Sequence, residues 1–197
     1  KKENRNFFNK LARYYDSGIL RVWLNKILLR AVEHVDIKKN SKILDVGCGT
    51  GNLLYLLSKK KNLKLYGIDI SKEMLKIARK KLEGKAKLKL ESAEKISFKN
   101  NYFDYVFSTE AFHHYADYDK VMKNFRRILK KNGFLVVVDL DFGFIFNKIF
   151  NIIEPGNSRM FSMLEFENLF KQYKFKNIKQ KIIGLFAVMT WGEKQRV

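Results

Sequence analysis

The amino-acid sequence predicts an α/β fold: a doubly wound, mostly parallel sheet of seven strands with helices on both faces. The main observation is that short apolar runs, interpreted as strands, alternate with segments of helical periodicity. The apolar runs lie near residues 43–46, 63–68, 86–90, 103–108 and 134–139, and two further β segments lie within 178–189 around Gly184. The helical patterns lie near residues 5–15, 20–35, 52–60, 72–82, 118–131 and 162–172. Such alternation is typical of parallel sheets.

The first apolar run leads directly into a glycine-rich turn, Gly47-Cys48-Gly49-Thr50-Gly51, which a helix follows. Glycine adopts positive φ and lets a ligand approach the backbone, while free N–H groups at the helix start face that ligand. The turn therefore predicts a nucleotide-binding loop. A dinucleotide fingerprint would have its third glycine where Asn52 stands, which disfavours a nicotinamide or flavin dinucleotide.

Polar residues follow the later strands as well. Asp69 ends the second strand, where an acidic side chain can accept both hydroxyl groups of a ribose. Ser71 is predicted to cap the next helix, which carries Glu73 in its first turn. A third motif, Glu91-Ser92-Ala93-Glu94, precedes the buried strand near 102–108.

In order and spacing, these segments and residues 125–137 resemble the class I S-adenosylmethionine-dependent methyltransferases. In particular they resemble the small-molecule group typified by quinone-biosynthesis C-methyltransferases, whose opening helix and Tyr-Asp pair are similar to residues 8–16. The resemblance implies one domain, 1–197, with a Rossmann-like methyltransferase fold and antiparallel strands at its C-terminal end. Its expected parts are a helical cap (1–40), a cofactor-binding core (41–140), a lid insertion (141–160) and a C-terminal helix with strands (161–197).

The resemblance also implies a cofactor: S-adenosylmethionine as methyl donor, with S-adenosylhomocysteine as product and no metal. The residues expected at the cofactor are Tyr15, Asp45, Gly47, Cys48, Gly49, Asp69, Ile70, Met74, Ser92, Ala93, Ser108 and His113. Asp45 is expected to hold the donor's amino group, directly or through water, and Asp69 the ribose. Ile70 and Met74 are expected to flank the adenine, with plain core packing as the alternative for Met74. Ser92 stands where the family usually has an acidic residue, so weaker adenine selection is expected.

Acceptor chemistry is expected after the fourth strand, where His113 and His114 lie at the carboxyl end of the sheet. A histidine titrates near neutrality and can take a proton from a phenol, enol or amine. His114, which matches the family's histidine best, and His113 are therefore the candidate catalytic residues, as a base or for positioning only. Four phenylalanines within 142–153 favour a lid over an apolar or aromatic acceptor, with core packing as the alternative.

Bulk composition sets further bounds. The single cysteine, Cys48, excludes an intrachain disulfide framework and is expected to be a packing residue. No apolar stretch reaches the ~20 residues that span a bilayer, so a soluble, cytoplasmic protein is expected. The formal charge of +20, from 40 basic and 20 acidic side chains, suggests phosphate-rich partners. Because the lysines are spread over nearly every predicted helix, solvated helix faces explain most of them.

The leading hypothesis is methyl transfer to a small, apolar or aromatic acceptor by in-line displacement. An RNA methyltransferase is the alternative that the charge suggests, but Ser108-Thr109-Glu110-Ala111 stands where base-modifying enzymes often carry an Asn/Asp-Pro-Pro-Tyr motif. A non-catalytic S-adenosylmethionine-binding partner protein is a further alternative, supported only by Ser92. Peripheral contact of the lid with an anionic membrane is also open, and the sequence assigns no oligomeric state.

Overall fold

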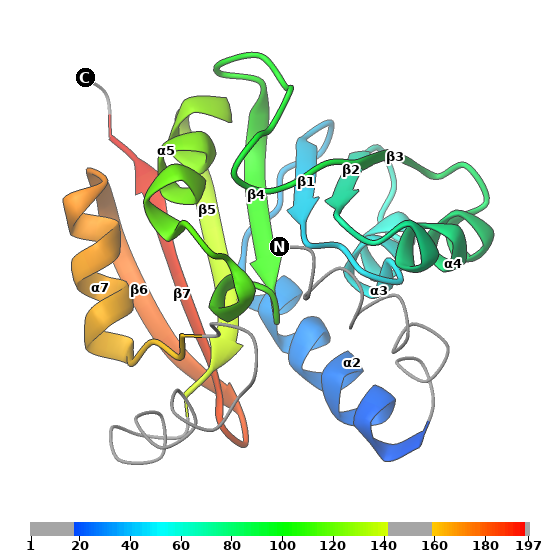
Figure 1. Cartoon of the computed structure of the whole chain (residues 1–197), viewed down its shortest axis with the longest axis horizontal. Helices are drawn as coiled ribbons and strands as arrows, with labels where there is room; N and C mark the ends of the chain where they lie inside the picture. Colours follow the sequence, from blue (N-terminus) through cyan, green and yellow to red (C-terminus); the bar gives the residue numbers. More distant parts are fainter. Residues whose placement is uncertain (1–17, 142–158, 196–197) are drawn as a thin grey trace.

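The computed structural model describes residues 18–141 and 159–195, which include a seven-stranded sheet (Figure 1). Its strands are β1 (Lys42–Val46), β2 (Lys64–Asp69), β3 (Ala86–Leu90), β4 (Phe103–Thr109), β5 (Leu129–Leu140), β6 (Phe175–Gly184) and β7 (Ala187–Lys194). The strand order is β3-β2-β1-β4-β5-β7-β6. The first five in this order are parallel, and β7 is antiparallel to both β5 and β6. The predicted fold class is confirmed, including the antiparallel C-terminal strands.

Helices cover both faces of this sheet. They are α2 (Gly18–His34), α3 (Asn52–Ser58), α4 (Lys72–Leu82), the short 3₁₀ helix η1 (Phe112–His114), α5 (Tyr118–Ile128) and α7 (Met163–Gln172). Buried side chains of α5 and α7 form one hydrophobic cluster with the sheet, and those of α2, α3 and α4 form a second cluster. The two clusters define a three-layer α/β/α arrangement (Figure 1).

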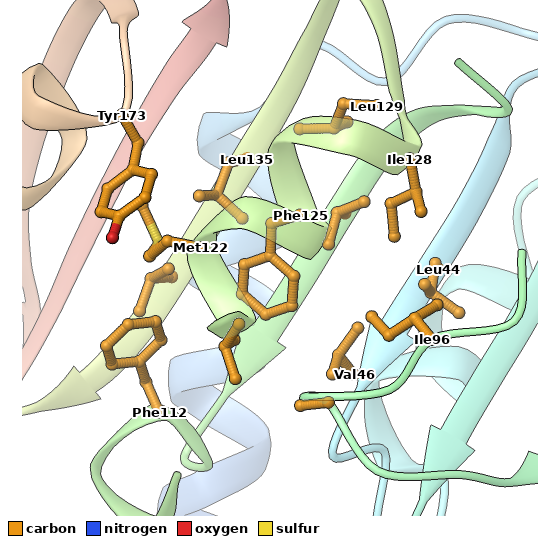
Figure 2. Packing of buried hydrophobic residues seen from close by; sticks show 14 of the residues in the cluster. Leu44, Val46, Ile96, Phe112, Met122, Phe125, Ile128, Leu129, Leu135 and Tyr173 are labelled. Atoms are coloured by element: carbon orange, nitrogen blue, oxygen red, sulfur yellow. The ribbon is translucent and has the colours of Figure 1, made fainter. Parts of the chain in front are cut away.

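Alternation along the strands explains the two clusters. In β1, Leu44 and Val46 belong to the α5 side, whereas Ile43 belongs to the α2 side. This is the period of two that a strand buried on both faces shows. Figure 2 shows Phe125 and Ile128 of α5 against the sheet, on the side of Leu44 and Val46.

One predicted boundary is wrong. The helical pattern near 118–131 was expected to continue through two lysines, but α5 ends at Ile128 and strand β5 starts at Leu129. Leu129 is extended, with ψ 138°, and pairs with Phe103 of β4. The Lys194 ammonium also donates to the Leu129 carbonyl at 2.7 Å. Tertiary pairing therefore overrides local helical propensity here.

The N-terminal segment is described only from residue 18 onward, so the expected helix near 5–15 and Tyr15 lie outside the described residues, as does most of the predicted lid. The second expected N-terminal helix is present as α2. Ile27 and Ala31 pack with α3 on a sheet face, and Arg30 donates to the Ile183 carbonyl of β6 at 2.8 Å. The described part of the cap is thus part of the core, and its capping of a cofactor stays a prediction.

The strand order reverses between β1 and β4. From β1 the chain moves outward to β2 and β3, whereas from β4 it moves the other way to β5. The connections therefore diverge above the carboxyl ends of these two central strands. In open α/β sheets, ligands bind at this topological switch point.

Candidate active site

The predicted site residues that the structure describes lie around this switch point. The glycine turn follows β1, Asp69 ends β2, and the segment from Glu110 to Tyr115 follows β4. Parallel register brings these ends level, since Val46 pairs with Ile68 and Thr109 with Val138. Segments far apart in the sequence thus share one edge of the sheet.

Backbone conformation explains the glycines of the turn. Gly47, Gly49 and Gly51 have φ of 76°, 51° and 80°, in the left-handed region that side chains disfavour. A Cβ on Gly47 would come within 2.6 Å of the Ala111 Cβ, so this glycine is also required by packing. A Cβ on Gly49 would have no atom of the described residues within 4 Å, which leaves open space beside the loop.

Asp69 fastens this loop to the next strand. Its Oδ2 accepts a hydrogen bond from the Gly49 amide and its Oδ1 one from the Ser71 amide, each at 2.8 Å. Burial raises the pKa of the Asp69 carboxyl, and the backbone donors oppose that rise. Ser71 caps α4 as predicted, because its hydroxyl accepts from the Met74 amide at 3.1 Å. The acid expected at the ribose is therefore also part of the loop's own support.

Asp45 is the unusual acid of the site. Its side chain is 1 % exposed, and its Oδ1 is buried without a hydrogen-bond partner among the described residues. Burial, together with the charge of Asp69, raises the pKa of Asp45 to about 8. A buried orphan carboxylate is costly unless a donor reaches it. A cationic amino group would be such a donor, so the structure fits the role expected for Asp45.

The third motif is arranged around Ser92. Its hydroxyl donates to the Glu94 carboxylate, and the Glu94 amide lies 3.3 Å from the same hydroxyl. Ala93 is buried in the core, and its carbonyl accepts from the Asn124 amide group at 3.1 Å. Ser92 and Glu94 therefore brace this loop together, and contact of Ser92 or Ala93 with adenine stays a prediction.

Cys48 has the environment of a packing residue. Its side chain is buried, and a Cβ on Gly67 of β2 would lie 2.8 Å from the Cys48 sulfur. Burial raises the pKa of the Cys48 thiol well above its ordinary value. A thiol held neutral in this way is a poor nucleophile. Among the other cofactor candidates, Met74 is buried and Ile70 half-buried.

Ser108 and Tyr115 link the two central strands. The Tyr115 hydroxyl donates to the Val46 carbonyl at 3.0 Å. Since a phenol has one proton, the Ser108 hydroxyl must donate in the 3.0 Å bond that joins it to Tyr115. The same phenol oxygen would lie 3.3 Å from a Cβ on Gly47. Ser108, which was expected to contact the cofactor, thus holds the Tyr115 phenol that bonds to the residue before the glycine loop.

The two histidines occupy different environments. The His113 ring bonds through Nδ1 to Asp139 of β5, whose other oxygen accepts from the His113 backbone amide at 2.9 Å. His114 is neutral under ordinary conditions, because burial and the neighbouring His113 lower its pKa to about 3. So low a proton affinity argues against His114 as a base. The structure therefore supports positioning by His113 more readily than proton transfer by His114.

Sequence reasoning missed one functional candidate. Glu110 follows β4 directly, and its Oε1 is buried without a hydrogen-bond partner among the described residues. Burial and the Asp139 carboxylate raise the pKa of Glu110 to about 8, while His113 lowers it. The available signal was an acid placed immediately after a buried strand, close to the position that Asp69 occupies at the end of β2.

A cavity of about 330 Å³ lies elsewhere, at the amino ends of β1 and β4. Its lining includes Lys38, Lys39 and Lys131, and Asp104, which pairs with Lys130 at 2.7 Å. Because it opens at the opposite end of the strands from the glycine loop, it is separate from the candidate active site.

The comparisons with known proteins agree with this geometry. A family described as "Methyltransferase domain" matches residues 44–137. A demethylmenaquinone methyltransferase from Chlorobaculum tepidum is 32% identical over 201 residues, covering 95% of this chain and 72% of the relative. A Haloferax volcanii methyltransferase, solved in complex with the Trm112 activator, superposes with a TM-score of 0.84 at 18% identity, covering 96% and 98% of the two chains. A SAM-dependent methyltransferase from Thermotoga maritima superposes with a TM-score of 0.77 at 21% sequence identity, covering 97% of this chain and 99% of that structure.

The strand order of the sheet, the glycine loop and these matches together define an α/β methyltransferase. The chain belongs to the class I S-adenosylmethionine-dependent methyltransferases, as its resemblance implied, and it is similar to the quinone C-methyltransferases among them. This family membership agrees with the absence of a dinucleotide fingerprint from the sequence. Within residues 18–141 and 159–195, no helix is long and apolar enough to cross a membrane. Over the same ranges, no group of His, Cys, Asp and Glu side chains could hold a metal ion.

Proposed function

We propose that this enzyme transfers the methyl group of S-adenosylmethionine to a hydroxylated aromatic small molecule of the quinol type. The observation that carries the cofactor half is the buried orphan oxygen of Asp45 beside an open, left-handed glycine loop. The acceptor half is supported by the relatives named demethylmenaquinone methyltransferase, which match nearly the whole chain.

The bound donor supplies a methyl group activated by a positively charged sulfur. The Asp45 carboxylate would bind its amino group, and the amides of the loop from Gly47 to Gly49 would approach its methionine part. Asp69 keeps acceptor capacity beyond its bonds from backbone amides, since each carboxylate oxygen has two lone pairs, and would bind the ribose. Ile70, Met74, Ser92 and Ala93 would surround the adenine.

Methyl transfer by in-line displacement demands alignment and exclusion of water more than covalent help. The bond from Tyr115 to Val46 and the pair formed by His113 and Asp139 fix the segment after β4 relative to the glycine loop. This segment lies where an acceptor would meet the donor's methyl group. The predicted lid, 141–160, and Tyr15 would complete the acceptor side.

Two measurements test the proposal. The first is calorimetric titration with S-adenosylmethionine, S-adenosylhomocysteine and NAD, comparing the wild type with Asp45→Asn, which removes the ionisable carboxyl group without removing any hydrogen bond described above. We expect micromolar-range binding of both sulfur ligands, weakened about 10-fold or more in the variant, and none of NAD. The second is transfer of labelled methyl to a short-chain demethylmenaquinone reduced to its quinol. Binding without transfer would refute the acceptor, and absence of binding by folded protein would refute the cofactor site.

The net charge of +20 supports no separate function. Several lysines are engaged in ordinary surface pairs, such as Lys120 with Asp117 at 2.6 Å and Lys171 with Glu167 at 2.5 Å. Such exposed pairs contribute little and mark a solvated surface. RNA methylation therefore has no observation in its favour beyond the charge itself.

A further inference from the structure

Glu110 combines a left-handed backbone with a side-chain oxygen that lacks a described hydrogen-bond partner. It is the first residue after β4, its amide donates to the Val138 carbonyl of β5 at 2.8 Å, and its φ is 52°. Glycine and asparagine adopt this left-handed conformation readily, whereas for other residues it costs about 1–2 kcal/mol. Strain of this kind persists where the surroundings impose it, and it often lies at functional sites.

The Glu110 residue is half-buried, but one of its carboxyl oxygens is fully covered. Its Oε1 is buried and has no hydrogen-bond partner within the described parts of the chain. A carboxylate that served only the loop would be expected to accept bonds from backbone amides, as Asp139 does from His113 and Leu140 at 2.9 Å each. Glu110 therefore presents a hydrogen-bond acceptor oxygen that a ligand can use.

Its neighbour Ala111 places Glu110 next to the glycine loop. Ala111, the next residue, lies so close to Gly47 that a Cβ on this glycine would be 2.6 Å from the Ala111 Cβ. The segment after β4 thus rests directly on the loop proposed to hold the methyl donor. The charged groups that face Glu110 are Asp139 of β5 and His113 of η1, and they act in opposite directions on its ionisation.

We propose that the Glu110 carboxylate is the general base that takes a proton from an acceptor hydroxyl group during methyl transfer. This assignment rests on the proposed function, because it requires a hydroxylated acceptor. The acceptor O–H bond breaks, and its proton goes to Oε1. The electron pair left on the acceptor forms the new bond to the methyl carbon, from oxygen or from an activated ring carbon. The carbon–sulfur bond breaks with its pair remaining on sulfur, and a proton displaced from a ring carbon leaves to water.

The two histidines fit this task less well. His114 has a proton affinity too low for an efficient base near neutral pH. His113 is fixed through Nδ1 by Asp139, and its carbonyl accepts from the Arg159 amide at 3.0 Å. His113 and Asp139 are therefore positioning residues for the segment that carries Glu110, whose pKa, raised to about 8, suits proton exchange under physiological conditions.

The test compares Glu110→Gln and Glu110→Asp with the wild type, using the short-chain demethylmenaquinol probe at saturating S-adenosylmethionine. We expect kcat to fall about 100-fold or more in E110Q, with KM little changed, and E110D to recover part of the rate. The wild-type kcat should rise with pH to a plateau above about pH 8, and the kcat of E110Q should not show this rise. Binding of S-adenosylhomocysteine checks that each variant folds. Glu83→Gln, at the exposed end of α4, controls for loss of one negative charge.

Infrared difference spectra of wild type minus E110Q, with S-adenosylhomocysteine bound, provide a readout that needs no acceptor. A protonated-carboxyl band that disappears with the same midpoint as the rise in kcat supports the assignment. A wild-type rate and pH profile retained by E110Q would overturn it, as would absence of that band near neutral pH. If wild-type protein binds donor but does not methylate the probe, the proposed acceptor fails, and the infrared titration alone decides whether Glu110 gives up its proton near pH 8, as the assignment requires.

Discussion

The Asp69 carboxylate and the Gly49 amide are joined by a hydrogen bond of 2.8 Å, although 20 residues separate them in the chain. The bond ties the acidic end of β2 to the glycine loop after β1. One side chain therefore has two tasks, holding the loop in shape and, as proposed, binding a ribose. The two tasks can be separated by substitution.

Asp69→Asn is expected to lower the free energy of unfolding less than Asp69→Ala does. The asparagine keeps one oxygen that can accept from an amide, whereas alanine leaves the half-buried Gly49 amide and the buried Ser71 amide without this partner, at a cost of about 1–3 kcal/mol. Urea denaturation measures this difference. Both variants should lose at least about tenfold in affinity for S-adenosylhomocysteine. Tight binding by D69N would show that Asp69 supports the loop only.

Proton release on ligand binding tests Asp45. Its pKa of about 8 means that the side chain is largely protonated at neutral pH, and a ligand ammonium would favour the ionised form. Binding of S-adenosylhomocysteine near pH 7 should therefore release close to one proton. Calorimetry in two buffers of different ionisation enthalpy counts it. Asp45→Asn should release almost none, and equal release by both proteins would remove Asp45 from the ligand site.

The same group makes stability depend on pH. The folded-state pKa of Asp45 lies above its ordinary value of 3.8, so the folded protein holds a proton that the unfolded chain has lost. The contribution of Asp45 to the free energy of unfolding is therefore full below about pH 4 and is lost as pH rises toward about 8. Asp45→Asn should flatten this decline in urea denaturation measured across the window. A decline of unchanged slope would contradict the raised pKa.

Gly47→Ala is expected to lower the free energy of unfolding by more than backbone strain at a left-handed position accounts for. Gly84 is a matched control, because its φ of 79° is close to the 76° of Gly47, while nothing described lies within 4 Å of a Cβ there. Gly84→Ala should cost about 1–2 kcal/mol of unfolding free energy from strain alone. Gly47→Ala should cost about 1–3 kcal/mol more, from the contact with Ala111, and should impair S-adenosylhomocysteine binding. Equal losses of unfolding free energy in the two variants would mean that the segment after β4 moves away from the new Cβ at no energetic cost.

Substitutions at Ser108 and Tyr115 separate support from ligand contact. Tyr115→Phe removes the donor to the Val46 carbonyl and the partner of Ser108, so it should destabilise the protein by about 1–3 kcal/mol. Ser108→Ala should cost less, because the bond to Val46 survives. If Ser108 only supports the loop, its alanine variant should change affinity for S-adenosylhomocysteine by less than about threefold. A larger loss would favour the predicted cofactor contact.

Local sequence signals were sufficient for the glycine loop and for the cap of α4. Gly47 and Gly49 were predictable because glycine alone adopts their conformation cheaply, and Ser71 because a hydroxyl before a helix satisfies free amides. The alternation of apolar runs with helical patterns likewise predicted the parallel sheet. The helix expected to reach residue 131 was misjudged because the pairing of Leu129 with Phe103 is not a local property.

The arrangement of the segment after β4 depended on contacts that the sequence does not display. His113 and Asp139 are 26 residues apart and meet only because β4 and β5 end level, as the pairing of Thr109 with Val138 shows. The strained backbone and buried oxygen of Glu110 likewise follow from that pairing and from the packing of Ala111 on Gly47. Side-chain identity alone gave no means to distinguish Glu110 from an exposed turn carboxylate.

Two residues at the ends of the predicted lid, Asp141 and Arg159, are both hydrogen-bonded to described parts of the fold. The Asp141 amide donates to the Phe186 carbonyl at 2.8 Å, its carboxylate accepts from the Met163 amide at 3.1 Å, and the Arg159 amide donates to the His113 carbonyl. Whatever sequence joins these points, its ends start from fixed positions, and added length increases the entropic cost of closing such a loop only slowly. Segments of different sequence could therefore be joined at these two points without rebuilding the sheet or the glycine loop, which makes them suitable junctions for testing whether the predicted lid selects the acceptor.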